Sequence, residues 1–142
     1  PFYDISLLGF NYYMEEISAS IGLSQLKKLN SMNARRIKIA KRYFKELEIS
    51  HKMPITNDSC YHLYWIIVKN RKKFREFMFK KGIETGIHYP SVHLMSLYRK
   101  KIKLPITEKI SQDIVTLPIR SNLDDTSLNY IIKTANSYFK KI

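Results

Sequence analysis

The sequence has one cysteine, few glycines, little acidic charge and no long apolar run. With Cys60 alone, no disulfide can form within the chain, which fits a reducing, cytoplasmic setting. None of the four glycines belongs to a glycine-rich loop that ends in Lys-Ser or Lys-Thr, so a nucleotide-hydrolysing fold is not expected. The longest apolar run, residues 61–68, has the length of a strand and is far shorter than the ~20 residues that cross a bilayer. We therefore expect no membrane partner.

Acidic residues are outnumbered by basic ones, 12 against 25, which gives a net charge of +13. A charge of this size raises nucleic acid as a partner. The lysines and arginines are spread along the chain, however, in pairs and triplets within helical patterns, and most should lie on solvated helix faces. A phosphorylated small substrate or an acidic partner domain explains part of the charge equally well. A basic nucleic-acid-binding domain is therefore kept only as an alternative function.

No set of side chains has the spacing of a metal site. The four histidines are His51, His62, His88 and His93. The spacing of His88 and His93 does not put both on one helical face, Pro90 lies between them, and no cysteine or carboxylate cluster completes a site. A serine or cysteine nucleophile with a nearby base also has no local signature. We predict no metal and no catalytic residue in this chain.

Helical periodicity dominates the first third of the chain. After a lead-in segment, residues 1–13, apolar residues recur at helical spacing over residues 14–48. The pattern predicts either one long helix or two helices bent near residues 30–33. The chain starts at Pro1, and we treat it as a piece of a longer polypeptide that forms a single domain, residues 1–142.

The rest of the chain alternates strands and shorter helices. Residues 61–68 are apolar on both faces and predict a covered strand, and residues 71–81 predict a helix that Gly82 ends. Alternation over residues 83–89 predicts another strand. The further predictions, in order, are a short helix or turn over residues 92–101 closed by Pro105, a helix from Thr107 to residue 113, an edge strand over residues 114–119, and a helix that Asp124 or Asp125 caps. This order predicts an α+β fold of two layers, with a small, mainly antiparallel sheet and helices packed on one side of it. The long helix precedes these elements in the sequence.

Two short stretches combine side chains that can bind a ligand. A Gly-aromatic-Asn turn at residues 9–11 feeds a helix, so the amide of Asn11 can project toward an anion. Residues 82–90 place the imidazole of His88 beside the phenol of Tyr89 at a strand end, where pockets form. Each stretch also has a plainer interpretation. Asn11 can simply cap the helix, and the histidine and tyrosine can form an ordinary strand end with aromatic packing.

Together and in this order, these stretches resemble the DegT/DnrJ/EryC1/StrS family of sugar aminotransferases. The likeness covers nearly the whole chain and depends on an ordered set of short motifs. The matching pieces are Gly9-Phe10-Asn11-Tyr12-Tyr13-Met14 with the small residues that follow it, Leu23-Ser24-Gln25-Leu26, His62-Leu63-Tyr64, Gly82-Ile83 through His88-Tyr89-Pro90 with His93 after it, and Thr116-Leu117-Pro118.

The resemblance implies a parent enzyme of the fold-type-I aminotransferase architecture. That enzyme would use pyridoxal phosphate to carry an amino group from glutamate to a keto-sugar nucleotide, with the cofactor as electron sink. In the family the Schiff-base lysine lies in the larger N-terminal domain, upstream of the segment that matches Gly9, so this chain is not expected to catalyse alone. The resemblance also implies a partnership with that domain and a homodimer, in which Asn11 reaches the cofactor phosphate of the neighbouring subunit. His88 and Tyr89 match positions near the sugar nucleotide.

One residue departs from the family pattern. The family usually has arginine where this chain has Tyr13, which we also assign to substrate binding. Arginine can hold a phosphate with two parallel hydrogen bonds and tyrosine cannot. The substrate phosphate is then bound by other basic residues, or the substrate differs. The same departure keeps open a second alternative, a non-catalytic binding or regulatory module derived from this fold.

Overall fold

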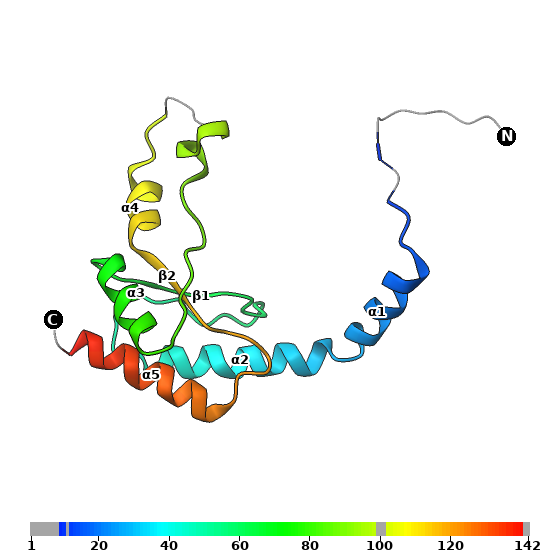
Figure 1. The fold of residues 1–142 in the computed structure, drawn as a ribbon, viewed down its shortest axis with the longest axis horizontal. Helices are drawn as coiled ribbons and strands as arrows, with labels where there is room; N and C mark the ends of the chain where they lie inside the picture. Colours follow the sequence, from blue (N-terminus) through cyan, green and yellow to red (C-terminus); the bar gives the residue numbers. More distant parts are fainter. Residues whose placement is uncertain (1–8, 11, 99–101, 141–142) are drawn as a thin grey trace. The chain divides into compact units, whose positions relative to one another are not determined.

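The computed structural model describes residues 9–10, 12–98 and 102–140. The chain divides into two compact units, Pro1–Asn30 and Ser31–Ile142. No helix in these described ranges is long and apolar enough to cross a membrane. The elements in chain order are α1 (Glu16–Leu26), α2 (Leu29–Glu46), β1 (Tyr64–Ile67), α3 (Arg71–Lys80), two short 3-10 turns, η1 (Val92–Leu94) and η2 (Ser96–Tyr98), then α4 (Pro105–Asp113), β2 (Ile114–Leu117) and α5 (Asp125–Phe139) (Figure 1).

The helical run over residues 14–48 is two helices rather than one. The chain turns at Lys27–Lys28, ahead of the expected bend near residues 30–33. At the turn, the amide of Lys28 donates to the carbonyl of Gln25, three residues back, so the last turn of α1 tightens. Apolar periodicity does not report this turn, because Leu26 and Leu29 keep the spacing across it. Within the first unit α1 has no buried residue.

The centre of the second unit is an antiparallel pair of strands. In β1 and β2, Tyr64 pairs with Leu117 and Ile66 with Val115. Single antiparallel bridges extend the ladder on both sides, Lys52 with Ile66 beside β1 and Gly86 with Thr116 beside β2. The predicted α+β fold with a small antiparallel sheet is thereby confirmed.

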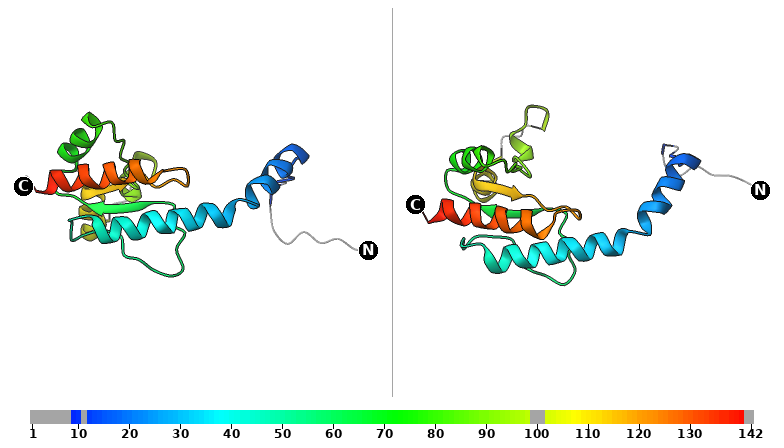
Figure 2. Two further views of the ribbon diagram at one scale, coloured as in Figure 1. Left: turned by 90° about the horizontal axis from the view of Figure 1, so that it is seen from below. Right: turned by 60° about the horizontal axis from the view of Figure 1, so that its bottom comes forward.

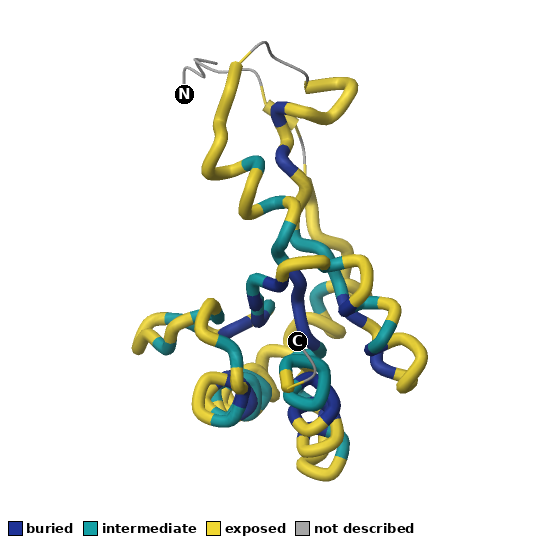
Figure 3. The backbone as a smooth tube through the Cα atoms, turned by 90° about the vertical axis from the view of Figure 1, so that its left-hand side faces the viewer, coloured by how far each residue is buried: buried dark blue, intermediate teal, exposed yellow. Residues whose placement is uncertain are grey.

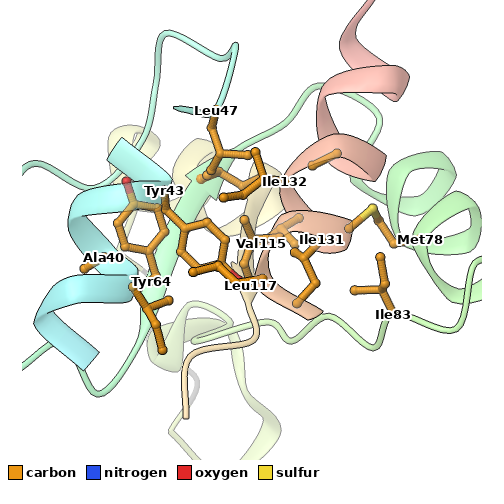
Figure 4. Packing of buried hydrophobic residues seen from close by; sticks show 14 of the residues in the cluster. Ala40, Tyr43, Leu47, Tyr64, Met78, Ile83, Val115, Leu117, Ile131 and Ile132 are labelled. Atoms are coloured by element: carbon orange, nitrogen blue, oxygen red, sulfur yellow. The ribbon is translucent and has the colours of Figure 1, made fainter. Parts of the chain in front are cut away.

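The hydrophobic core lies between one face of this ladder and the helices. Figure 2 shows α2 and α5 side by side along the strands, and Figure 3 shows buried positions concentrated where the strands meet the helices. The side chains at alternating strand positions are buried in this core: Tyr64, Ile66, Val115 and Leu117. The ring of Tyr64 lies 5.0 Å from that of Tyr43 of α2 (Figure 4). The other core residues of the helices are Ile39 and Ala40 from α2, Phe74 and Met78 from α3, and Leu128, Ile131, Ile132 and Ala135 from α5.

Local signals placed two of the helices well. α3 ends where Gly82 takes a positive φ of 71°, a conformation that suits glycine after a helix. The carboxylate of Asp124 accepts the amide of Ser127 at 2.7 Å and caps α5, as expected. α3 and α5 are joined through aromatic rings, with Phe74 stacked on Phe139 at 5.5 Å.

Three boundaries differ from the sequence prediction. The strand predicted over residues 61–68 is only four residues long, and Tyr61, which has a positive φ of 51°, lies outside it. Residues 83–89 contribute one bridge at Gly86 rather than a full strand. Pro105 begins α4 instead of closing the preceding region, since the first helical turn needs no proline N–H. Because the helix already begins at Pro105, Thr107 lies inside it and does not cap it.

Candidate ligand groove

The four predicted binding residues fall in different parts of the chain. Asn11 lies outside the described residues. Tyr13 belongs to the first unit, where its side chain is exposed. His88 and Tyr89 belong to the second unit and are neighbours, with ring centroids 4.9 Å apart in an edge-to-face arrangement. The peptide bond between them is cis.

His88 lines a groove of about 900 Å³ in the second unit. One wall comes from residues 82–88 and another from β2 and the loop that follows it, with α5 closing the side. The groove is lined by polar and charged side chains, among them one carboxylate and one guanidinium: His62, Glu84, Thr85, His88, Thr116, Arg120, Thr126, Ser127 and Tyr130. No lysine is among the residues that line the groove. The donor set therefore suits a polar, oxygen-rich ligand, and it offers no amine to anchor an aldehyde cofactor covalently.

The His88 ring is held by a hydrogen bond to β2. Its Nδ1 atom lies 2.7 Å from Oγ1 of Thr116. Thr116 points to the face of the ladder opposite the core, because its neighbours Val115 and Leu117 point into the core. Thr116 is nevertheless only 4% exposed. Residues 86 and 88 share that face, so the ring of His88 lies beside the threonine that pairs with Gly86.

Gly86 leaves the space that the His88 ring occupies. Its amide and carbonyl form two hydrogen bonds with Thr116, at 3.0 and 2.9 Å. A Cβ atom at position 86 would lie 2.5 Å from Cε1 of His88 and 2.6 Å from Oγ1 of Thr116. Such distances are far inside van der Waals contact, so Gly86, His88 and Thr116 form one packed unit.

Tyr89 turns to a second, more apolar hollow of about 740 Å³. This hollow is lined chiefly by the segment from Pro90 to α4. Tyr89 is 65% exposed there. The two adjacent residues that the sequence singled out together thus border different hollows, and only His88 lines the polar groove.

His93 connects η1 to α4. Its Nε2 atom lies 3.0 Å from a carboxylate oxygen of Glu108, and its side chain is nearly buried. The amide of Leu104, and after it the His93 ring, lower the pKa of Glu108. No group of three or more possible metal ligands occurs in the described ranges. In this structure the contact between His93 and Glu108 joins η1 to α4.

Sequence reasoning missed Gly86 and Thr116 as parts of the site. Gly86 and His88 lie two residues apart in the stretch predicted as a strand, which puts them on one face and was a usable signal. Thr116 was noted only as part of a Thr-Leu-Pro motif. Its partner lies 28 residues away in the chain, and no local pattern indicates that pairing.

The comparison with known families decides what kind of protein carries this groove. The model of the DegT/DnrJ/EryC1/StrS aminotransferase family matches residues 2–136. The chain belongs to this family. Among the relatives of this chain, GDP-perosamine synthase of Escherichia coli O157:H7 is 29% identical over 140 residues, which cover 94% of the chain and 38% of that synthase.

Solved structures of relatives have the same fold. DesV of S. venezuelae is 26% identical to this chain, with a TM-score of 0.86 over 99% of the chain and 40% of DesV. The PLP form of Spr1654 from Streptococcus pneumoniae is 28% identical, with a TM-score of 0.81 over 98% of the chain and 39% of that protein. The chain thus spans about two fifths of the length of these relatives. Pyridoxal phosphate is the cofactor that this family of aminotransferases uses.

Proposed function

We propose that the chain is the C-terminal part of a nucleotide-sugar aminotransferase. The whole enzyme transfers an amino group from glutamate to a keto-sugar nucleotide, with pyridoxal phosphate as cofactor, in polysaccharide or amino-sugar biosynthesis. The observation that carries the proposal is the family match over residues 2–136, joined to a polar groove built from the motif residue His88. The described chain contributes binding groups, and the cofactor supplies the electron sink when it is bound.

Each motif residue has a binding role in this proposal. Asn11 donates to the cofactor phosphate of the neighbouring subunit, and His88 hydrogen-bonds the sugar nucleotide from the groove. Tyr89 and Tyr13 are assigned to substrate binding as well, and their exposed phenol rings support their accessibility to a ligand. Because tyrosine cannot hold a phosphate as arginine does, basic side chains such as Arg120 in the groove supply the positive charge.

The reactive amine belongs to another part of the enzyme. The groove is lined by no lysine, and we assign the Schiff base to a lysine in the N-terminal aminotransferase domain. The assembly we propose is a cytoplasmic homodimer in which each cofactor site takes residues from both subunits. The chain alone is then not a catalyst.

Reductive labelling tests the proposal. The natural polypeptide that contains residues 1–142 is purified with pyridoxal phosphate, reduced with borohydride and mapped by peptide mass spectrometry. We expect one stoichiometrically labelled lysine outside these residues, and no amino transfer by the 142-residue chain alone. Stoichiometric labelling of a lysine within the chain would contradict the assignment. A natural protein that binds no pyridoxal phosphate would favour the non-catalytic module instead.

A further inference from the structure

The hydroxyl of Thr116 has one hydrogen-bond partner. Its Oγ1 atom contacts Nδ1 of His88 at 2.7 Å, and no other partner of this hydroxyl occurs in the described part of the chain. The nearby backbone groups of Gly86 and Thr116 bond to each other. Thr116 borders the groove but is only 4% exposed, so water has little access to its hydroxyl.

This arrangement favours one position for the ring proton. A threonine hydroxyl has one proton to donate, and a neutral histidine ring has one donor nitrogen and one acceptor nitrogen. If Nδ1–H donated to Thr116, the hydroxyl proton would be buried without an acceptor, which is a costly state. If the hydroxyl donates to Nδ1, both groups are satisfied. The ring proton of His88 must then be on Nε2.

The other ring nitrogen is the one that a ligand can use. Nε2 of His88 has no hydrogen-bond partner within the described residues, and His88 lines the polar groove. Gly86 leaves room for the ring in this position, since a Cβ there would strike both His88 and Thr116. A fixed Nε2–H group donates to an oxygen acceptor and does not accept a proton from a hydroxyl.

We propose that Thr116 is a positioning residue that holds neutral His88 in its Nε2–H form. The groove then presents one oriented donor to an oxygen of the ligand, such as a phosphate or carbonyl oxygen. The role in substrate binding rests on the proposed function, whereas the position of the proton is a property of this chain alone.

Nitrogen NMR of the ring tests the proposal directly. The 142-residue chain, labelled with 15N, is examined at about pH 8.5, some two units above the ordinary histidine pKa of ~6.5. Long-range proton–nitrogen spectra show which ring nitrogen carries the proton. His88→Gln assigns the signal, and exposed His62, which lines the same groove, is the internal control. We expect His88 to be fully in the Nε2–H form with a hydrogen-bonded Nδ1.

Two variants separate positioning from mere packing. Thr116→Val keeps the shape and removes the hydroxyl, so the His88 signals should move to the mixture of forms that His62 shows. Thr116→Ser should restore the wild-type signals. An Nδ1–H form in the wild-type chain, or unchanged His88 signals in Thr116→Val, would overturn the proposal. If the valine variant does not fold, the wild-type spectrum still decides. A confirmed Nε2–H form in the chain, together with a natural longer polypeptide that shows no aminotransferase activity, would refute only the proposed function.

Discussion

Gly86→Ala should destabilise the chain at a position where the backbone itself tolerates alanine. Gly86 does not have the positive φ that favours glycine. A glycine-to-alanine change at such a site usually stabilises a protein by about 0.4–1 kcal/mol, because the unfolded chain loses freedom. Here the new methyl would lie 2.5 Å from the His88 ring and 2.6 Å from the Thr116 hydroxyl, so both side chains must turn away.

The cost follows from what that movement breaks. The hydrogen bond between His88 and Thr116 is lost, and the buried hydroxyl is left without a partner, which costs about 1–3 kcal/mol. After the gain from the unfolded state is subtracted, we expect a net destabilisation of about 1–2 kcal/mol. Urea unfolding followed by the fluorescence of the single tryptophan, Trp65 in β1, measures it.

A double-mutant cycle tests the stated cause. In His88→Ala the ring is absent and Thr116 is free to rotate, so Gly86→Ala in that background should cost little or should stabilise. The coupling energy should be at least ~1 kcal/mol, well above the error expected for independent sites. The reasoning is refuted if Gly86→Ala is as stable as the wild type, or if its cost is the same with and without His88.

Three further predictions concern the fold and the charge. Tyr43→Phe should lower the free energy of unfolding by about 1–3 kcal/mol, because the buried hydroxyl donates to the Pro118 carbonyl at 2.7 Å. The control, Tyr130→Phe at an exposed site, should cost less than ~0.5 kcal/mol. Equal costs for the two variants in urea titrations would contradict this prediction. Asp124→Ala should lower the thermal midpoint at neutral pH, and Asp124→Ser, which keeps a capping oxygen, should not. Because the amide of Ser127 lowers the pKa of the Asp124 carboxyl, the stabilisation is complete above the unfolded pKa of ~3.9 and is lost as pH falls through the lower folded pKa. If the alanine variant has the same thermal midpoint as the wild type at every pH, Asp124 does not cap the helix. In gel-shift titrations the chain should bind DNA only weakly and lose that binding steeply with salt, and retention at ~200 mM salt would instead support the nucleic-acid alternative.

The elements that the sequence predicted correctly are those fixed by neighbours in the chain. Gly82 ends α3 and Asp124 caps α5 because each acts on a backbone group within a few residues. The alternation that places Tyr64 and Ile66 in the core is likewise local. Boundaries that depend on the backbone conformation of single residues were missed. Tyr61 has a positive φ of 51°, which its apolar side chain does not reveal, and it lies outside the strand.

The candidate site was predicted only in part for the same physical reason. His88 was visible because a polar ring at a strand end, beside a proline turn, is unusual in an apolar alternating stretch. Tyr89 was visible too, but the structure turns it toward a different hollow. The roles of Asn11 and Tyr13 stay predictions, with Asn11 outside the described residues.

Thr116 explains why residues that only support a site are harder to find than those that touch a ligand. In the sequence it is a β-branched residue within an apolar strand, and its strand position alone would place it on a solvated face. It becomes buried because residues 83–88 return beside β2 and lay the His88 ring over it, which the bridge between Gly86 and Thr116 makes possible. The glycine, the histidine and the threonine each have an ordinary explanation when taken singly. Only their pairing across the ladder turns a flexible imidazole into an oriented donor, so the specificity of this groove depends on sheet register as much as on the residues that line it.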